Sequence, residues 1–137
     1  MFALSNSPLN AYKAVQTDVA VAAASPHNLI VLLFDGALAA IAAARTNLAQ
    51  GNIEAKGLAV SKAIDIITNG LKVSLDQEAG GELAQNLADL YDYAVRRLVQ
   101  GNLKNQVAAF DEVTALLNEI RGAWVEIGNR ANSESPA

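Results

Sequence analysis

Apolar residues recur every three or four positions in four stretches of the chain, and turn-forming residues separate these stretches. This spacing places the apolar side chains along one face of a helix. The first predicted helix begins at Ser25-Pro26, because serine caps a helix start and proline suits its first position. It ends at Gln50-Gly51-Asn52, where glycine favours a C-terminal cap. The pattern predicts the other three helices at about 53–75, 82–100 and 103–127.

Short connections between such helices predict that neighbours run antiparallel. We therefore expect an all-α fold, an antiparallel up-down-up-down four-helix bundle over residues 25–127. Residues 1–24 contain apolar side chains, among them Leu9 and Tyr12, three positions apart, and are expected to form an N-terminal capping segment. The polar residues 128–137 are expected to form a flexible tail.

The amino-acid composition supports the helical prediction and disfavours some classes of partner. Hydrophobic residues make up 52% of the 137 residues but aromatic residues only 5%, which favours Ala- and Leu-rich helices over strands. A net charge of −4 without a basic run disfavours a nucleic-acid partner. The apolar stretch 29–44 contains Asp35 and is too short to span a bilayer, so no membrane insertion and a cytoplasmic location are expected.

The first helix is more apolar than one face of a bundle requires. Its core stripe consists of Ile30, Leu33, Ala37, Ile41, Ala44 and Leu48. A second stripe consists of Val31, Phe34, Leu38 and Ala42. A helix that is apolar on all sides must be covered on all sides. We expect the N-terminal segment, a second copy of the chain or a partner to cover this helix.

The sequence offers little catalytic or metal-binding chemistry. The only histidine, His27, has no glutamate three positions before it and is expected to be a solvated residue of the first helical turn. Asp35 is expected to accept hydrogen bonds from Arg96 or Arg97, and Trp124 is expected in the core. We therefore predict no catalytic residue, no metal and no cofactor, and a protein that is not an enzyme.

Four sequence blocks together resemble one known family. They are SPHNLIVLLFDGA at 25–37, SLD to GGE at 74–82, NLADLYDY with RRL at 86–98, and NLKN at 102–105. Trp124 lies where that family keeps a tryptophan. In order and spacing these blocks resemble the flagellin export chaperones of the FliS family.

The resemblance implies a cytosolic bundle that binds the disordered C-terminal segment of flagellin. Such a chaperone keeps flagellin unpolymerised and presents it to the flagellar export gate protein. The resemblance also implies that the N-terminal segment, here with Leu9 and Tyr12, caps an apolar groove until flagellin displaces it.

We expect the groove at Val31, Phe34, Leu38, Tyr91 and Tyr93, although both tyrosines could instead belong to the core. Binding would then be of the helix-in-groove kind. The free chain is expected to be a monomer or a weak homodimer. An alternative is a homo-oligomeric helical interaction protein, whose extra apolar stripe forms a symmetric dimer interface.

Overall fold

The computed structural model of the chain describes residues 25–134, and the side chains of residues 25–130 among them. The predicted capping segment, with Leu9 and Tyr12, lies outside the described residues. The described part is all-α, with four helical rods packed together. They are α3 (Pro26–Ala49), α4 (Ile53–Ile66) continued by the π-helix η2 (Ile67–Lys72), α5 (Gln77–Lys104) and α6 (Val107–Glu134).

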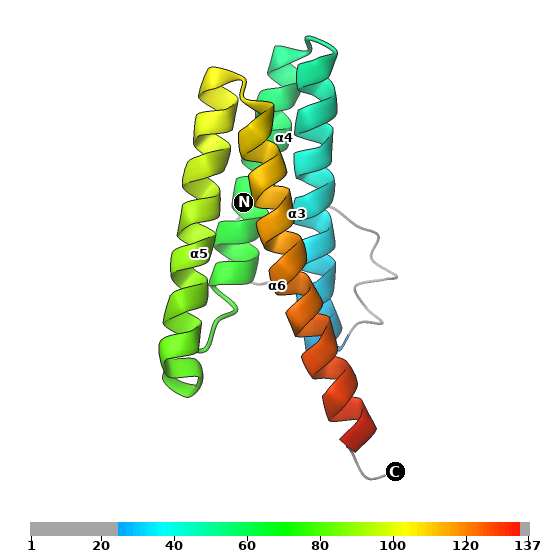
Figure 1. The fold of residues 1–137 in the computed structure, drawn as a ribbon, viewed down its shortest axis with the longest axis vertical. Coiled ribbons are helices and arrows are strands. Elements are labelled where there is room, and N and C mark those ends of the chain that lie inside the picture. Colours follow the sequence, from blue (N-terminus) through cyan, green and yellow to red (C-terminus); the bar gives the residue numbers. More distant parts are fainter. Residues whose placement is uncertain (1–24, 135–137) are drawn as a thin grey trace, which may run out of the picture.

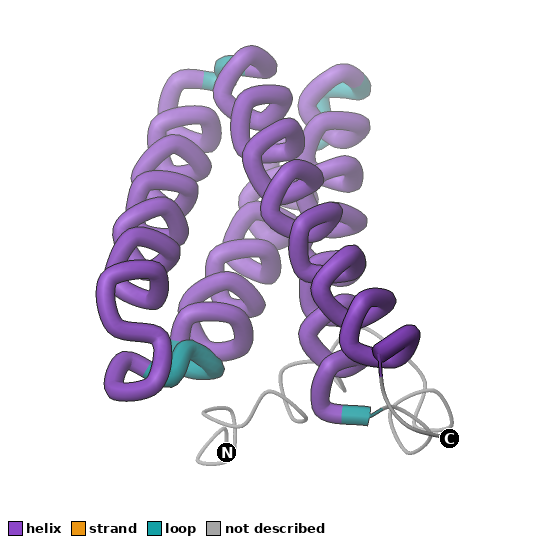
Figure 2. The backbone as a smooth tube through the Cα atoms, turned by 60° about the horizontal axis from the view of Figure 1, so that its bottom comes forward, coloured by secondary structure: helices purple, strands orange, loops and turns teal. Residues whose placement is uncertain are grey.

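Each connection turns the chain back on itself, so that α3 and α5 run in one direction and α4 and α6 in the other (Figure 1). The rods lie close together at the end that holds the connections 50–52 and 105–106, which we call the closed end. Toward the other end, α5 and α6 separate (Figure 2). We call this the open end, and it contains the connection 73–76 and the first turn of α3.

The start and the end of α3 are confirmed as predicted. The Ser25 hydroxyl accepts a hydrogen bond from the Asn28 amide at 3.2 Å, and Gln50 ends the helix before Gly51, whose φ is +76°. By length and composition alone α3 could span a membrane, with a mean hydropathy of 1.8 in its most apolar window. In the described structure α3 instead packs against α4, η2 and α6, and serves as the central core helix.

The third helix has an additional short helical stretch before the start predicted at residue 82, and its predicted end at residue 100 is wrong. Asp76 caps the N-terminus by accepting a hydrogen bond from the Ala79 amide at 3.0 Å, so α5 begins at Gln77 and then breaks at Gly81, where φ is +51° and ψ is −126°. At the other end the helix continues through Gly101. A Cβ there would lie 2.9 Å from the Phe110 ring, so this glycine serves close packing rather than helix termination.

The helix α5 ends instead at Asn105, which has the left-handed φ of 54° that asparagine tolerates. Lys56 on α4 is only 3% exposed and holds this terminus, because its Nζ donates to the Asn102 carbonyl at 2.8 Å and to the Asn105 side chain. A cation is favourable at a helix C-terminus. These contacts tie α4 to α5 at the closed end.

Two further bounds differ from the prediction. The second helix ends at Lys72, in the π-helical turn η2, and not at Leu75. The fourth helix begins at Val107 and continues to Glu134, beyond the expected end at Ile127. A salt bridge of 2.6 Å between Glu126 and Arg130, one helical turn apart, supports this extension of α6.

The core runs along the inner faces of all four rods. At the closed end Leu98, Phe110 and Val113 are 0% exposed. Toward the open end the core reaches Phe34 and Tyr91, which are 1% and 3% exposed. Beyond these two aromatic residues α5 and α6 separate, while α3 remains packed against α6 and η2 against α5 (Figure 1).

Candidate functional site

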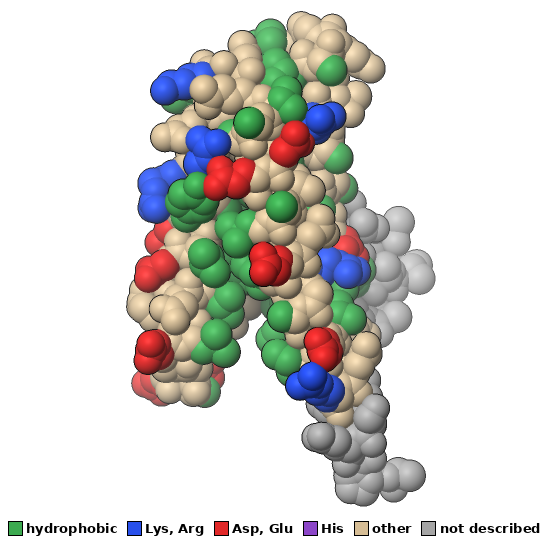
Figure 3. All heavy atoms as spheres, viewed as in Figure 1, with side chains coloured by type: hydrophobic (Ala, Val, Ile, Leu, Met, Phe, Trp, Pro, Cys, Tyr) green, Lys and Arg blue, Asp and Glu red, His purple; other side chains and the backbone are tan. Residues whose placement is uncertain are grey.

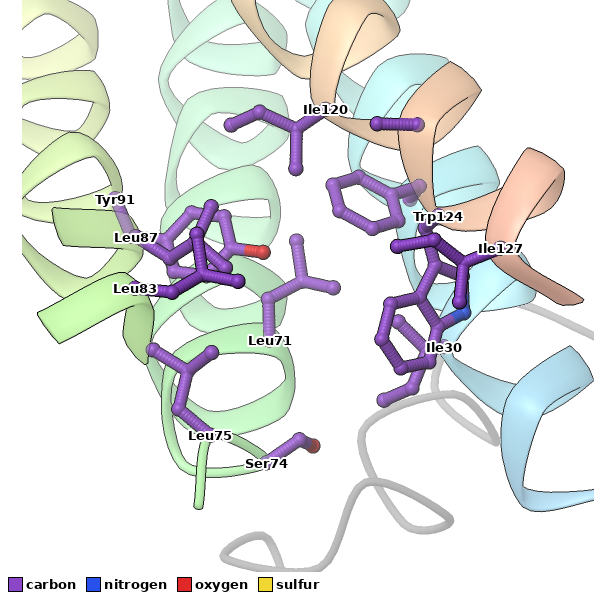
Figure 4. A pocket seen from close by; sticks show the side chains of 12 residues that line it. Ile30, Leu71, Ser74, Leu75, Leu83, Leu87, Tyr91, Ile120, Trp124 and Ile127 are labelled. Atoms are coloured by element: carbon purple, nitrogen blue, oxygen red, sulfur yellow. The ribbon is translucent and has the colours of Figure 1, made fainter. Parts of the chain in front are cut away.

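An apolar cavity of about 200 Å³ lies at the open end, above Phe34 and Tyr91. All four rods contribute side chains to it, and Figure 4 shows most of them pointing toward one another across the opening. The lining residues are Ile30, Phe34, Leu71, Ser74, Leu75, Leu83, Leu87, Tyr91, Ile120, Ala123, Trp124 and Ile127. None of these side chains is charged, so apolar contact is the main interaction that the cavity offers.

Two neighbouring cavities extend the first one. A cavity of about 470 Å³ reaches the start of α3 at Pro26 and His27, and one of about 340 Å³ reaches the start of α5 at Ala79. Ser74 and Trp124 line all three cavities, which therefore form one continuous depression. We call it the groove. Figure 3 shows hydrophobic side chains along the facing edges of the two limbs that border it.

Each wall of the groove is a pair of packed helices joined by an ion pair. In the first wall, Arg121 of α6 donates to Asp35 of α3 at 2.7 Å. In the second wall, Lys72 of η2 donates to Asp92 of α5 at 2.7 Å. All four side chains are partly exposed, so each pair adds little stability. Each pair links two neighbouring helices within one wall.

The observed partner of Asp35 corrects our expectation of Arg96 or Arg97. Arg97 instead pairs with Glu112 of α6 at 2.6 Å, and the Arg96 guanidinium lies 5.9 Å from the centre of the Tyr93 ring. Arg97 is therefore bound to α6 and Arg96 lies beside a tyrosine of its own helix.

Phe34 and Tyr91 form the floor of the groove. Their ring centres are 6.4 Å apart and the rings are tilted by 53°, a favourable aromatic arrangement. Burial raises the pKa of Tyr91 to about 12, because the charged phenolate is disfavoured away from water. Figure 4 shows this hydroxyl pointing into the groove, where it and Ser74 supply the polar groups of the main cavity.

The other three residues predicted for the groove do not line it. Val31 and Leu38 are half-buried on α3, and Leu38 packs against the core. Tyr93 donates its hydroxyl to Glu112, which raises the pKa of Tyr93. Hydrogen bonds from Tyr93 and Arg97 in turn lower the pKa of Glu112. Of the five predicted positions, the structure therefore brings only Phe34 and Tyr91 together at the groove.

The rim of the groove exposes large apolar side chains that follow the helical spacing of the apolar pattern. Leu83 of α5 is 64% exposed and Ile127 of α6 is 56% exposed. Periodicity correctly places both on the inner faces of their helices, but it carries no information on how far apart those faces lie. Apolar residues gathered around a depression indicate a surface that binds a partner.

His27 and Trp124 form the end of the groove nearest the start of α3, and here two expectations are wrong. The rings are stacked with centres 4.7 Å apart and planes within 10°, so His27 is not a solvated residue. The Trp124 indole N–H donates to the His27 carbonyl at 3.0 Å. Trp124 is half-buried and lines the groove, and so lies at the edge of the core and not inside it.

Among residues 25–130, no three histidine, aspartate or glutamate side chains gather as metal ligands would.

Comparison with known proteins identifies the relatives of this chain. The sequence model of the family described as "Flagellar protein FliS" matches residues 8–131. The chain belongs to the FliS family.

Curated FliS proteins are similar over most of their length. The chain is 54% identical to the "Flagellar secretion chaperone FliS" of Salmonella typhimurium over 126 residues, which cover 92% of this chain and 93% of the relative. It is 49% identical to that of Escherichia coli over 85% of both chains, and 34% identical to that of Bacillus subtilis over 84% of both. The resemblance found in the sequence is thereby confirmed, and these relatives are described as chaperones rather than enzymes.

Proposed function

We propose that this chain is a cytosolic flagellar secretion chaperone that binds the C-terminal segment of flagellin in the groove. Two features support the proposal: the family and the names of its curated members, and the groove itself. The groove is the observation that supports the proposal most strongly, because the uncharged lining of its main cavity and its exposed apolar rim match the apolar face of an amphipathic helix. Flagellin covered in this way cannot polymerise early and can be delivered to the flagellar type III export apparatus and its gate protein.

The floor and the rim have different parts in this proposal. Ordering a disordered segment costs about 2–5 kcal/mol, so the contact must be long and apolar. Leu83 and Ile127 are the most exposed large apolar side chains of the lining, one on each wall, and would contact the bound helix first. Phe34 and Tyr91 are already buried and would form the surface on which its deepest side chain rests.

We also propose that residues 1–24 cap the groove of an antiparallel up-down-up-down bundle, with Leu9 and Tyr12 as the contacting side chains. Val31 and Leu38 remain predictions for the same partner, because neither is fully covered on α3. If the cap competes with flagellin, deletion of residues 1–24 raises the affinity for the flagellin segment.

Isothermal titration calorimetry of the chain with a peptide of the cognate flagellin C-terminal segment tests the proposal. We expect binding with a micromolar or lower dissociation constant and a negative heat-capacity change, the signature of apolar burial. Absence of binding at micromolar concentration would contradict it. Sedimentation of the free chain tests the alternative, since a stable dimer that ignores the peptide would indicate a homo-oligomeric interaction protein.

A further inference from the structure

The contact between α3 and α6 at the end of the groove is more specific than ordinary helix packing. Two parts of one residue, His27, fix one side chain, Trp124. The His27 carbonyl accepts the indole N–H at 3.0 Å, which sets the direction of the indole. The His27 imidazole lies parallel to the indole with ring centres 4.7 Å apart, which sets its plane.

Gly128 of α6 provides the space for this arrangement. A Cβ at position 128 would lie 2.1 Å from the His27 Nε2 and 2.5 Å from its Cε1, closer than any real contact. Gly128 lies inside a helix, and its φ is not positive. Glycine in a helix interior costs about 1 kcal/mol relative to alanine. The structure therefore accounts for Gly128 by the close approach of the His27 ring.

The position of the indole matters because Trp124 lines all three cavities of the groove. A tryptophan that is free to rotate would block some cavities and enlarge others. Contacts that hold the indole in advance lower the cost of binding, since less side-chain freedom is lost on association.

We propose that His27 is a positioning residue for partner binding, because it holds Trp124 in place as part of the wall of the groove. Gly128 leaves the space that the His27 ring occupies. This inference rests on the proposed function, because it assumes that a partner occupies the groove. It assigns a binding role to a first-turn histidine that makes no contact in the main cavity.

Trp124 is the only tryptophan of the chain, so its state can be measured directly. We expect His27→Ala to weaken the near-ultraviolet circular dichroism of Trp124 and to lower its fluorescence anisotropy in the free protein. The same variant should bind the flagellin C-terminal peptide about fivefold more weakly, the value of one aromatic contact. His27→Phe, which keeps a stacking ring, should bind within about twofold of the unsubstituted chain.

A pair of glycine variants on α6 provides the matched control. Gly128→Ala should reproduce the effects of His27→Ala on both signals, although alanine favours the helix. Gly122→Ala should change neither, because nothing lies within 4 Å of a Cβ at that position. The double variant His27→Ala/Gly128→Ala should bind no more weakly than His27→Ala alone, since both changes remove the same contact.

The two arms of the experiment separate this inference from the proposed function. A His27→Ala chain with unchanged Trp124 signals and unchanged peptide affinity would overturn the positioning role. Equal losses in Gly122→Ala and Gly128→Ala would also overturn it, because they would indicate a general sensitivity of α6. If the unsubstituted chain does not bind the peptide, the proposed function fails and the binding role of His27 fails with it. The Trp124 signals would then still report whether His27 orients the indole.

Discussion

The closed and open ends of this bundle are built from the same four rods and use their apolar residues differently. At the closed end Phe110, Leu98 and Val113 are completely buried, and Gly101 lets α5 and α6 approach closely. At the open end Leu83 and Ile127 remain more than half exposed around a groove. Apolar residues on the inner face of a helix can thus either stabilise the fold or remain exposed as a surface that binds a partner. The separation of the helices decides which of the two they do.

Polar contacts follow the same division. Lys56 binds the last turn of α5 at the closed end and joins neighbours across the bundle. At the open end the pairs Asp35–Arg121 and Lys72–Asp92 each lie within one wall of the groove. Neither of these two pairs crosses the opening. The two walls are joined instead by the packing of α3 against α4 and η2.

The largest expected effect is on stability at the closed end. Phe110→Ala should lower the free energy of unfolding by about 4 kcal/mol, because it removes a fully buried ring and leaves a cavity. Urea denaturation measures the loss. Leu103→Ala is the control, since Leu103 is 76% exposed and its truncation should change stability by less than about 0.5 kcal/mol. Equal losses in both variants would contradict a filled core at this end.

The next effect concerns binding at the open end. The double variant Leu83→Glu/Ile127→Glu should weaken binding of the flagellin C-terminal peptide roughly hundredfold, because two carboxylates would have to be desolvated in the complex. Its urea midpoint should barely move, since both side chains are largely exposed. Leu58→Glu/Leu103→Glu carries the same charge at exposed sites outside the groove and should bind normally. Similar affinities of the two double variants would rule out the groove as the binding site.

An alkaline pH tests the burial of the groove floor. The pKa of Tyr91 is raised from 10.0 to about 12, so the unfolded chain loses this proton first as the pH rises. Stability from this group is fully present below pH 10 and is lost between about pH 10 and 12, by at most roughly 3 kcal/mol. Tyr91→Phe should reduce the difference in unfolding free energy between pH 9 and pH 11. An unchanged pH dependence would indicate that Tyr91 is solvated.

The smallest expected effect distinguishes two glycines. Gly101→Ala should destabilise the chain by about 1–2 kcal/mol, since the new Cβ would lie 2.9 Å from the Phe110 ring and 3.0 Å from the Ala109 Cβ. Gly122→Ala has open space around it and should stabilise the chain by up to about 1 kcal/mol. Thermal melts of the two variants measure the difference. A stabilising Gly101→Ala would show that α5 and α6 are not tightly packed there.

Much of the fold was predictable from local signals. The cap at Ser25, the end of α3 at Gln50 and the presence of four helical segments each depend on neighbouring residues, and the structure confirms them. The end predicted at residue 100 is wrong because the glycine that follows, Gly101, serves close packing, and only the position of Phe110 reveals this use.

The candidate site was less predictable than the fold. The sequence predicts Phe34 and Tyr91 at the groove, but it places Trp124 in the core and does not distinguish Leu83 and Ile127 from core residues. Periodicity defines the inward face of each helix, whereas the groove arises from the separation of α5 from α6. That separation depends on how all four helices pack together, so the sequence pattern of a single helix does not reveal it. The stack of His27 on Trp124 joins residues 97 positions apart, so local sequence patterns could not predict it either.

The most direct test of the difference between the two ends is site-specific photocrosslinking. The photoreactive residue benzoylphenylalanine would replace Leu83 at the groove rim or Leu58 on α4, which are similarly exposed at 64% and 70%. Each chain would be irradiated with the flagellin C-terminal peptide at equal concentrations. We predict that position 83 forms a crosslinked adduct and position 58 does not. Crosslinking from position 58 without any from position 83 would contradict the assignment of the groove as the client-binding site.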